Sequence, residues 1–148
     1  MLHRTTLTLV AETLADAEDD WWLIGGAAVA LQGLDIAIAD IDVLMSRRDI
    51  ERVIARLGIA PVQGMAIDRI RSEIWARWTA PALVVDLMAG LQVRTGDRWT
   101  RVAPAARQAV DVDGRTLYVP ARSELIDILR LFGRPKDLKR AEGLARVA

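Results

Sequence analysis

The spacing of apolar residues changes several times along the first third of the chain, and each change predicts a new element. Helical spacing over residues 5–18 predicts an amphipathic helix, and the apolar run WWLI that begins at Trp21 predicts a strand. Gly25 and Gly26 interrupt that strand. The segment AAVALQGL then consists mainly of helix-forming residues and stops at Gly33, so we expect a short helix that begins at Gly26.

Residues 38–45 have the period of two that is typical of a strand, yet two carboxylates lie within this otherwise apolar segment. The two faces of the predicted strand carry Ile41, Val43 and Met45 on one side and Asp40, Asp42 and Leu44 on the other. Ser46 begins a capping sequence, and the apolar spacing after it predicts a helix that ends at Gly58. Two aspartates are therefore expected side by side on one face of a buried strand.

The second half of the chain is predicted to contain more strands and to end in helices. Between residues 61 and 79 only the segment SEIWARWTA alternates clearly, whereas ALVVDLMAG is apolar except for Asp86. Asp113 and Gly114 mark a hairpin turn, and Gly133 and Pro135 separate two helices. The predicted elements are strands over 72–80 and 82–90, loop and short strand over 92–107, a hairpin over 108–119, and helices over 123–133 and 135–147.

Length and charge restrict the class of protein. A chain of 148 residues that is 52% hydrophobic has the size of one ordinary domain, so we expect a single domain over residues 1–148. Lys and Arg total 20, as do Asp and Glu, which leaves no global positive field for nucleic acid or an anionic membrane. No apolar run approaches the roughly 20 residues of a membrane span, and the first residues do not read as a signal peptide. We therefore expect a cytoplasmic protein with no membrane partner.

The residue types that are missing point to carboxylate chemistry. The chain has no Cys, and its single histidine is His3, so thiolate metal sites and histidine-based triads are excluded. Asp40 and Asp42 occupy positions i and i+2 of a strand and would lie about 6.5–7 Å apart at Cα. Asp86, on a second apolar strand, would complete a cluster. Three carboxylates without soft ligands favour Mg²⁺ or Mn²⁺, the cations that accompany phosphates.

Gly25 and Gly26 predict that the same site also binds phosphate. A residue without Cβ lets phosphate oxygens approach the backbone, and the N–H groups that open the next helix supply hydrogen-bond donors and partial positive charge. Because the two glycines precede the strand of Asp40 and Asp42 so closely, the segment predicts a metal–nucleotide site.

The order of these motifs resembles the nucleotidyltransferase superfamily related to DNA polymerase β. The resemblance covers most of residues 21–144 and is carried by IGGAAVALQGL, DIDVL, VVDLMAG and ELIDILRLFGRPKDLKRAEGL. These segments are most similar to the small bacterial branch that contains abortive-infection-type toxins and lincosamide or aminoglycoside nucleotidyltransferases. The resemblance implies an α+β fold in which helices flank a central mixed β-sheet and a helix pair stands at the C-terminus.

The resemblance also implies an activity. Proteins of this superfamily transfer a nucleoside monophosphate from an NTP to an acceptor and release pyrophosphate, with Mg²⁺ or Mn²⁺ as cofactor. Asp40 and Asp42 would hold the metal that bridges the triphosphate. Asp86 would share the other metal and activate the acceptor hydroxyl or take its proton.

Nucleotide-binding residues follow from the same resemblance. Gly25 and Gly26 would seat the β- and γ-phosphates. Arg134, Lys136 and Asp137 match an R-x-K-D stretch in which a basic residue would meet phosphate and the acid would orient it.

Three positions depart from the family pattern, and they leave a second function open. Ile36 and Ile38 stand where Arg and Ser or Thr often precede the D-x-D motif, and only Arg130 is present where a Lys is frequent. The alternative is a catalytically weakened module that binds a nucleotide or a partner, such as one half of a toxin–antitoxin pair.

The acceptor is not identified by the sequence. A small molecule, a protein and an RNA end all stay open, as does a protein partner or a homo-oligomer. An RNA acceptor would require a basic face, for which the candidates are Arg47–Arg48, Arg69–Arg71 and Arg130–Arg134.

Overall fold

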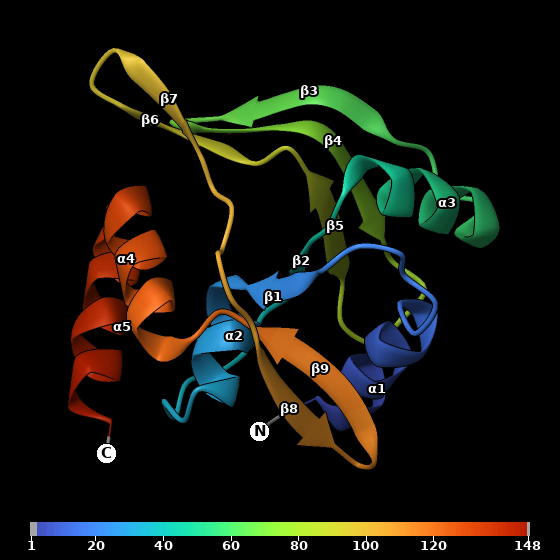
Figure 1. Cartoon of the computed structure of the whole chain (residues 1–148), viewed down its shortest axis with the longest axis horizontal. Coiled ribbons are helices and arrows are strands. Elements are labelled where there is room, and N and C mark those ends of the chain that lie inside the picture. The colour runs from blue at the N-terminus through green and yellow to red at the C-terminus, as the bar shows by residue number, and fades with distance from the viewer. Residues whose placement is uncertain (1–2, 148) are drawn as a thin grey trace.

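The computed structural model describes residues 3–147 and shows helices arranged around a curled mixed sheet (Figure 1). The helices are α1 (Arg4–Thr13), α2 (Gly25–Leu31), α3 (Arg47–Leu57), α4 (Arg122–Phe132) and α5 (Pro135–Arg146). The strands are β1 (Trp22–Ile24), β2 (Ile41–Leu44), β3 (Val62–Ile67), β4 (Ile70–Trp78), β5 (Val85–Ala89), β6 (Gln92–Thr95), β7 (Arg98–Arg101), β8 (Gln108–Val112) and β9 (Arg115–Val119). The predicted α+β class, with a central mixed sheet and a C-terminal helix pair, is confirmed.

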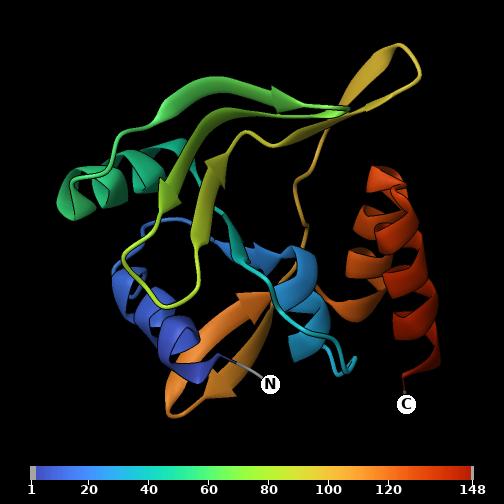
Figure 2. The same cartoon turned by 180° about the vertical axis from the view of Figure 1, so that it is seen from behind.

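The main sheet has the strand order β1-β2-β5-β4-β6-β7, and β3 pairs with β4 off this path. Strands β2 and β5 are parallel, whereas the other pairs of this sheet are antiparallel. The parallel register places Asp42 directly opposite Asp86. Strands β8 and β9 form a separate hairpin beside α1, as both views show (Figures 1 and 2).

Two groups of buried apolar side chains hold these elements together. The larger core contains the alternate residues of β2 and β5, among them Ile41, Val43 and Leu87, together with side chains from all five helices. A smaller cluster joins Met88 of β5 to Phe132 of α4 and neighbouring residues. Since Met88 lies two residues beyond Asp86, α4 covers the same face of the sheet that carries the carboxylates.

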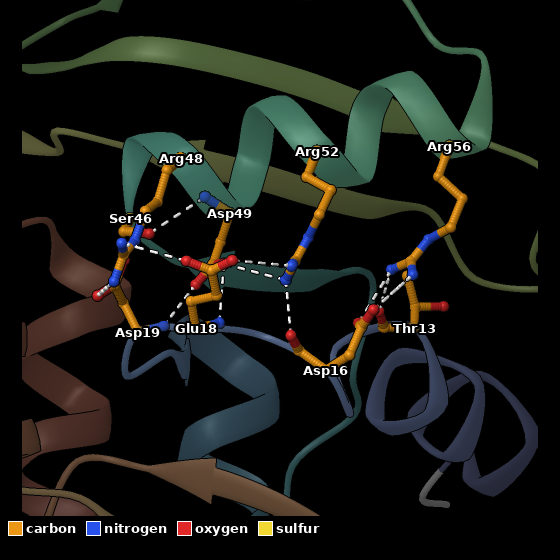
Figure 3. A network of polar contacts seen from close by, with 9 residues as sticks. All are labelled: Thr13, Asp16, Glu18, Asp19, Ser46, Arg48, Asp49, Arg52 and Arg56. Atoms are coloured by element: carbon orange, nitrogen blue, oxygen red, sulfur yellow. Dashed lines mark hydrogen bonds and ion pairs between the residues drawn. The ribbon is translucent and has the colours of Figure 1, made fainter.

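A buried carboxylate on α3 fixes the loop that leads into β1 (Figure 3). Asp49 is only 1% exposed and accepts hydrogen bonds from the backbone N–H groups of Glu18 and Asp19, at 3.0 and 2.9 Å. Arg52 donates to the same carboxylate at 3.2 Å and to the carbonyl oxygen of Asp16 at 2.7 Å. Helix α3 therefore positions the chain immediately before β1, the strand that precedes the two glycines.

Most predicted elements are confirmed. Ser46 caps α3 by accepting from the N–H of Asp49 at 3.2 Å, and Gly58 ends this helix in the left-handed region. The β8–β9 hairpin turns at Asp113 and Gly114, which both have positive φ. None of the helices within residues 3–147 is long and apolar enough to cross a membrane.

Some predicted boundaries are wrong. Helix α1 ends at Thr13 instead of residue 18, and arginines of α3 bind the chain after it: Arg56 donates to the carbonyl oxygen of Thr13 and Arg52 to that of Asp16. Asp40 lies just before β2 and not within it. A further strand, β3, pairs with β4 through a turn at Asp68, and residues 92–107 contain a hairpin that turns near Gly96.

Candidate functional site

A cavity of about 520 Å³ lies between the carboxylate face of the sheet and the start of α5. It brings together segments from both ends of the chain. The seven residues that the sequence predicted for metal or nucleotide binding all line it, namely Gly25, Gly26, Asp40, Asp42, Asp86, Arg134 and Lys136.

Three carboxylates converge at one end of this cavity. The parallel pairing of β2 with β5 sets Asp42 beside Asp86, and Asp40 reaches the same point from the residue before β2. One oxygen of each residue lies within 4.8 Å of the others. Oxygen atoms at this separation suit coordination of a hard divalent cation such as Mg²⁺ or Mn²⁺.

The electrostatics of the cluster also fit a cation. Burial, together with repulsion from Asp40 and Asp86, raises the pKa of Asp42 to about 7, although Lys136 and Arg134 oppose this shift. A divalent cation would relieve the same repulsion and would favour the ionised form of all three groups. The donor set consists only of oxygen atoms, as Mg²⁺ requires.

Gly25 and Gly26 face the carboxylates from the start of α2. Gly25 has a φ of +63°, and a Cβ there would lie 2.5 Å from Oδ2 of Asp42. A Cβ on Gly26 would approach the guanidinium of Arg140 at 3.4 Å. Gly25 therefore requires glycine both for space beside Asp42 and for its backbone conformation, whereas a Cβ at Gly26 would only contact the flexible end of Arg140.

Helix α5 supplies positive charge on the opposite wall. Asp137 is 1% exposed and accepts from Arg134 through the backbone N–H at 3.3 Å and through Nε at 2.6 Å. This pairing fixes Arg134 at the start of the helix. Lys136 and Arg140, one helical turn apart, both line the cavity. The cavity thus has carboxylates at one wall and cations at another.

Comparison with known proteins identifies the fold. No family model and no curated protein sequence matches the chain. A candidate nucleotidyltransferase from Thermotoga maritima is 18% identical, with a TM-score of 0.74 over 99% of this chain and 94% of that one. The lincosamide antibiotic adenylyltransferase LnuA, with lincomycin bound, is 12% identical, with a TM-score of 0.62 over 97% of each chain. The antibiotic-resistance factor ANT(2″)-Ia, in complex with adenylyl-2″-tobramycin, is 15% identical, with a TM-score of 0.59 over 95% of this chain and 88% of that one.

The chain has the nucleotidyltransferase fold. The resemblance that the sequence motifs indicated is therefore confirmed for the fold. Within this nucleotidyltransferase fold, Ile38 is 6% exposed and belongs to the larger core, and Ile36 packs against it. These two isoleucines thus have a packing role, and the cations of the cavity come from β4, from α5 and from Arg134, the residue before α5.

Sequence reasoning missed a group of cavity residues that the nucleotidyltransferase fold brings to the site. Arg77 of β4 binds Asp86 through two hydrogen bonds, from Nε at 2.9 Å and from Nη2 at 3.3 Å. Trp75 and Arg71 of the same strand also line the cavity, as does Arg140. The spacing of Arg140, four residues after Lys136, was a usable signal. Arg77 could not be found this way, because its contact depends on the β4–β5 register.

Proposed function

We propose that this protein is a metal-dependent nucleotidyltransferase that transfers a nucleoside monophosphate from an NTP to a hydroxyl acceptor. The observation that carries the proposal is the convergence of Asp40, Asp42 and Asp86 within 4.8 Å in a cavity whose other wall is cationic. Solved structures of the same fold include an adenylyltransferase and a complex with an adenylylated antibiotic, which supports the same class of reaction. The proposal places the reaction in the cytoplasm, where NTPs are available.

The three aspartates are the residues that would hold Mg²⁺ or Mn²⁺. A bound metal supplies positive charge that offsets the charge of the triphosphate and favours ionisation of the acceptor hydroxyl. Lys136 and Arg140 would pair with phosphate oxygens, and the backbone at Gly25 and Gly26 would seat the β- and γ-phosphates.

The transfer step conserves atoms and charge. The acceptor oxygen forms a bond to the α-phosphorus of the NTP while the bond from that phosphorus to the pyrophosphate oxygen breaks. Pyrophosphate leaves with the electron pair, next to the cations of α5. The acceptor proton passes to the carboxylate of Asp86, which would act as general base.

The ion pair with Arg77 affects the proposed role of Asp86 as general base. The guanidinium of Arg77 donates to both oxygens of Asp86, so it competes with a metal or a proton for that carboxylate. The Arg77 side chain is 51% exposed, which leaves it room to rotate into solvent.

A catalytically weakened binding module is the second candidate function. Two observations favour it: Ile36 and Ile38 pack in or against the core, and Arg77 pairs with Asp86. Such a protein would bind metal and nucleotide without transfer, for example as one partner of a toxin–antitoxin pair.

Ligand-dependent stability tests the site itself. Mg²⁺ or Mn²⁺ together with an NTP should raise the melting temperature more than either alone, since ligands that bind only the native state stabilise it. Unchanged melting temperatures with all four NTPs and both metals at millimolar concentration would refute a metal–nucleotide site.

Matched variants then separate the enzyme from the binding module. Asp86→Asn should reduce labelled-NMP transfer about 100-fold and leave much of the NTP affinity, because general-base help is lost. Asp40→Asn should reduce both transfer and affinity. Asp111→Asn is the control, because Asp111 belongs to the chain's other D-x-D triplet and is an exposed residue of the β8–β9 hairpin. Equal transfer by the wild type and Asp86→Asn would remove Asp86 from the mechanism.

A further inference from the structure

One face of the β6–β7 hairpin carries arginines around a tryptophan. Arg71 pairs with Gln92, Gln92 pairs with Arg101, and Arg94 pairs with Trp99. Side chains of directly paired residues lie on the same side of a sheet, so these five residues share one face, which we name the arginine–tryptophan face. The neighbouring pair of Ile70 with Val93 belongs to the opposite face and packs toward α4.

Neighbouring side chains hold Arg71 of this face in place, but no carboxylate in the described part of the chain neutralises the positive charge of its arginines. The guanidinium of Arg71 lies 3.9 Å from the centre of the Trp99 ring, and its Nε donates to Oε1 of Gln92 at 2.6 Å. No carboxylate within residues 3–147 lies within 4.0 Å of a guanidinium nitrogen of Arg71, Arg94 or Arg101. In a chain with a formal net charge of zero, this face is a local excess of positive charge.

The other basic segments that the sequence offered for RNA do not form such a face. Arg47 and Arg48 make ion pairs with acidic residues of α3 and of the loop before β1. Arg69 donates to the carbonyl oxygen of Phe132, and Arg134 is paired with Asp137. Of those segments, Arg71 alone contributes to the arginine–tryptophan face.

The face leads into the cavity. Arg71 lines the cavity together with Asp86, and the same Arg71 stacks on Trp99 of the hairpin. The β6–β7 hairpin projects past the end of α4, beyond the rest of the sheet (Figures 1 and 2). Side chains on one face of a strand recur about every 6.5–7 Å, so Trp99 and Arg101 on β7, and Gln92 and Arg94 on β6, form an extended track.

We propose that the arginine–tryptophan face binds a single-stranded nucleic acid whose terminal hydroxyl enters the cavity as the acceptor. The acceptor role rests on the proposed function, whereas the binding does not. Unpaired arginines attract backbone phosphates, and the indole of Trp99 offers a surface on which a base can stack. An extended track that continues outside the cavity suits a polymer, because a small anion would need only the cavity.

Binding of labelled oligonucleotides to the full chain tests this inference without catalysis. A fluorescein-labelled 12-nucleotide single strand, as RNA and as DNA, is titrated with protein at several salt concentrations, and anisotropy gives the affinity. Arg94→Ser should weaken binding several-fold and reduce the slope of log K against log salt by about 1. Arg146→Ser removes the same charge from the last turn of α5, near the opposite end of the molecule, and should change neither value (Figure 1).

Trp99 tests the stacking half of the inference. Trp99→Ala should weaken binding about tenfold with little change in the salt slope, and Trp99→Phe should restore most of the affinity. If Trp99→Ala does not fold, as judged by circular dichroism, the comparison of Trp99→Phe with Arg94→Ser still decides. Phe at this position should preserve binding, whereas loss of the Arg94 charge should not.

The outcomes separate the inference from the proposed function. Oligonucleotide binding that depends on Arg94 and Trp99, without any labelled-NMP transfer, supports the nucleic-acid face and counts against the enzyme. No binding by the wild type, or equal binding by Arg94→Ser and Arg146→Ser, overturns the inference even if NMP transfer to a small molecule occurs. Polyglutamate that binds as tightly, with the same dependence on both residues, overturns it in favour of an acidic protein partner.

Discussion

Gly25 shows how one backbone position controls a carboxylate of the site. Its φ lies in the left-handed region, and a Cβ at this position would lie 2.5 Å from Asp42, so any side chain would displace the aspartate. Gly58 has a similar φ of +69°, and a Cβ there would have no atom within 4 Å. The two glycines therefore share the backbone requirement and differ only in their surroundings.

This difference gives a matched pair of variants. Gly25→Ala and Gly58→Ala should each lower the free energy of unfolding by about 1–2 kcal/mol, the usual cost of a left-handed alanine. Only Gly25→Ala should also weaken binding of Mn²⁺ with NTP, by about tenfold or more, because the Asp42 carboxylate must rotate away. Urea unfolding and calorimetry measure the two effects. If Gly25→Ala and Gly58→Ala bind Mn²⁺ with NTP with affinities within twofold of each other, Asp42 adjusts to the new side chain without leaving the site.

Arg77 allows a second test of a single residue. Because its guanidinium takes both oxygens of Asp86, Arg77→Gln should strengthen Mn²⁺ binding several-fold by removing a competing cation. Calorimetric titration of the protein with Mn²⁺ measures this change. Weaker binding by Arg77→Gln would mean that Arg77 orients Asp86 for the metal.

The sequence predicted the acidic and glycine residues of the site together with Arg134 and Lys136, but not the arginines of β4. Asp40, Asp42 and Asp86 interrupt apolar segments, and such an interruption is visible without a structure. Arg71 and Arg77 lie in an alternating strand, where a charged residue on the exposed side is ordinary. Their proximity to the site follows from the pairing of β4, which local spacing does not reveal.

At the scale of elements, α3 is attached to the loop before β1 mainly through Asp49. Asp49→Ala should lower the free energy of unfolding by about 2–4 kcal/mol, because the N–H groups of Glu18 and Asp19 lose their acceptor. Glu51→Ala, which breaks an exposed pair with Arg47 on the same helix, should cost less than about 0.5 kcal/mol. Urea denaturation gives both values. A similar effect of the two variants would show that the buried carboxylate does not hold the loop.

The contact between α3 and the loop before β1 should stabilise the fold to an extent that depends on pH, because Asp19 takes part in it. Hydrogen bonds from Arg48 and Ser46 lower the pKa of Asp19 to about 2, below its ordinary value of 3.8. A lowered pKa stabilises the fold above the unfolded pKa, and this contribution is lost as pH falls from about 4 to about 2.

Comparison with Asp19→Asn isolates this contribution. The urea midpoint of the wild type should exceed that of Asp19→Asn by a small amount at pH 6, and the difference should shrink as pH approaches 2. About 0.5 M NaCl should reduce the difference at pH 6, because the pair is exposed to solvent. A difference that grows toward low pH would contradict the assignment.

Elements with strong local signals were predictable, and elements defined by pairing were not. Helix α3 has a Ser cap, an amphipathic repeat and a terminal glycine, so its two ends were found within one residue. Strand β3 is largely exposed, and its residues do not alternate in polarity. It is a strand because the edge of β4 supplies its hydrogen-bond partners, and that information lies outside the segment.

For the molecule as a whole, the cavity joins segments that are distant in sequence. Carboxylates come from β2 and β5, whereas Lys136 and Arg140 come from α5. The fold class was predictable from the order of the motifs. The shared cavity required the strand order, in which β5 inserts between β2 and β4.

A ligand that spans the cavity should therefore protect both walls at once. With Mg²⁺ and NTP, hydrogen exchange should slow in β2 and in the first two turns of α5, and the β8–β9 hairpin should serve as the internal control. Mass spectrometry of peptides measures this directly. Protection of β2 without α5 would mean that the metal binds but the cations of α5 do not hold the triphosphate.

The parallel pairing of β2 with β5 has a consequence for the order of events during synthesis. Asp42 cannot meet Asp86 until α3, β3 and β4 have been made, because all three lie between the two strands. Pairings between such distant segments form slowly compared with local helices and hairpins. A nascent chain that has emerged only as far as β5 has its carboxylates but none of the cations of α5. If the protein has the proposed function, capture of the nucleotide has to wait for the helix that contains Lys136 and Arg140, and partly synthesised chains on the ribosome would not consume NTP.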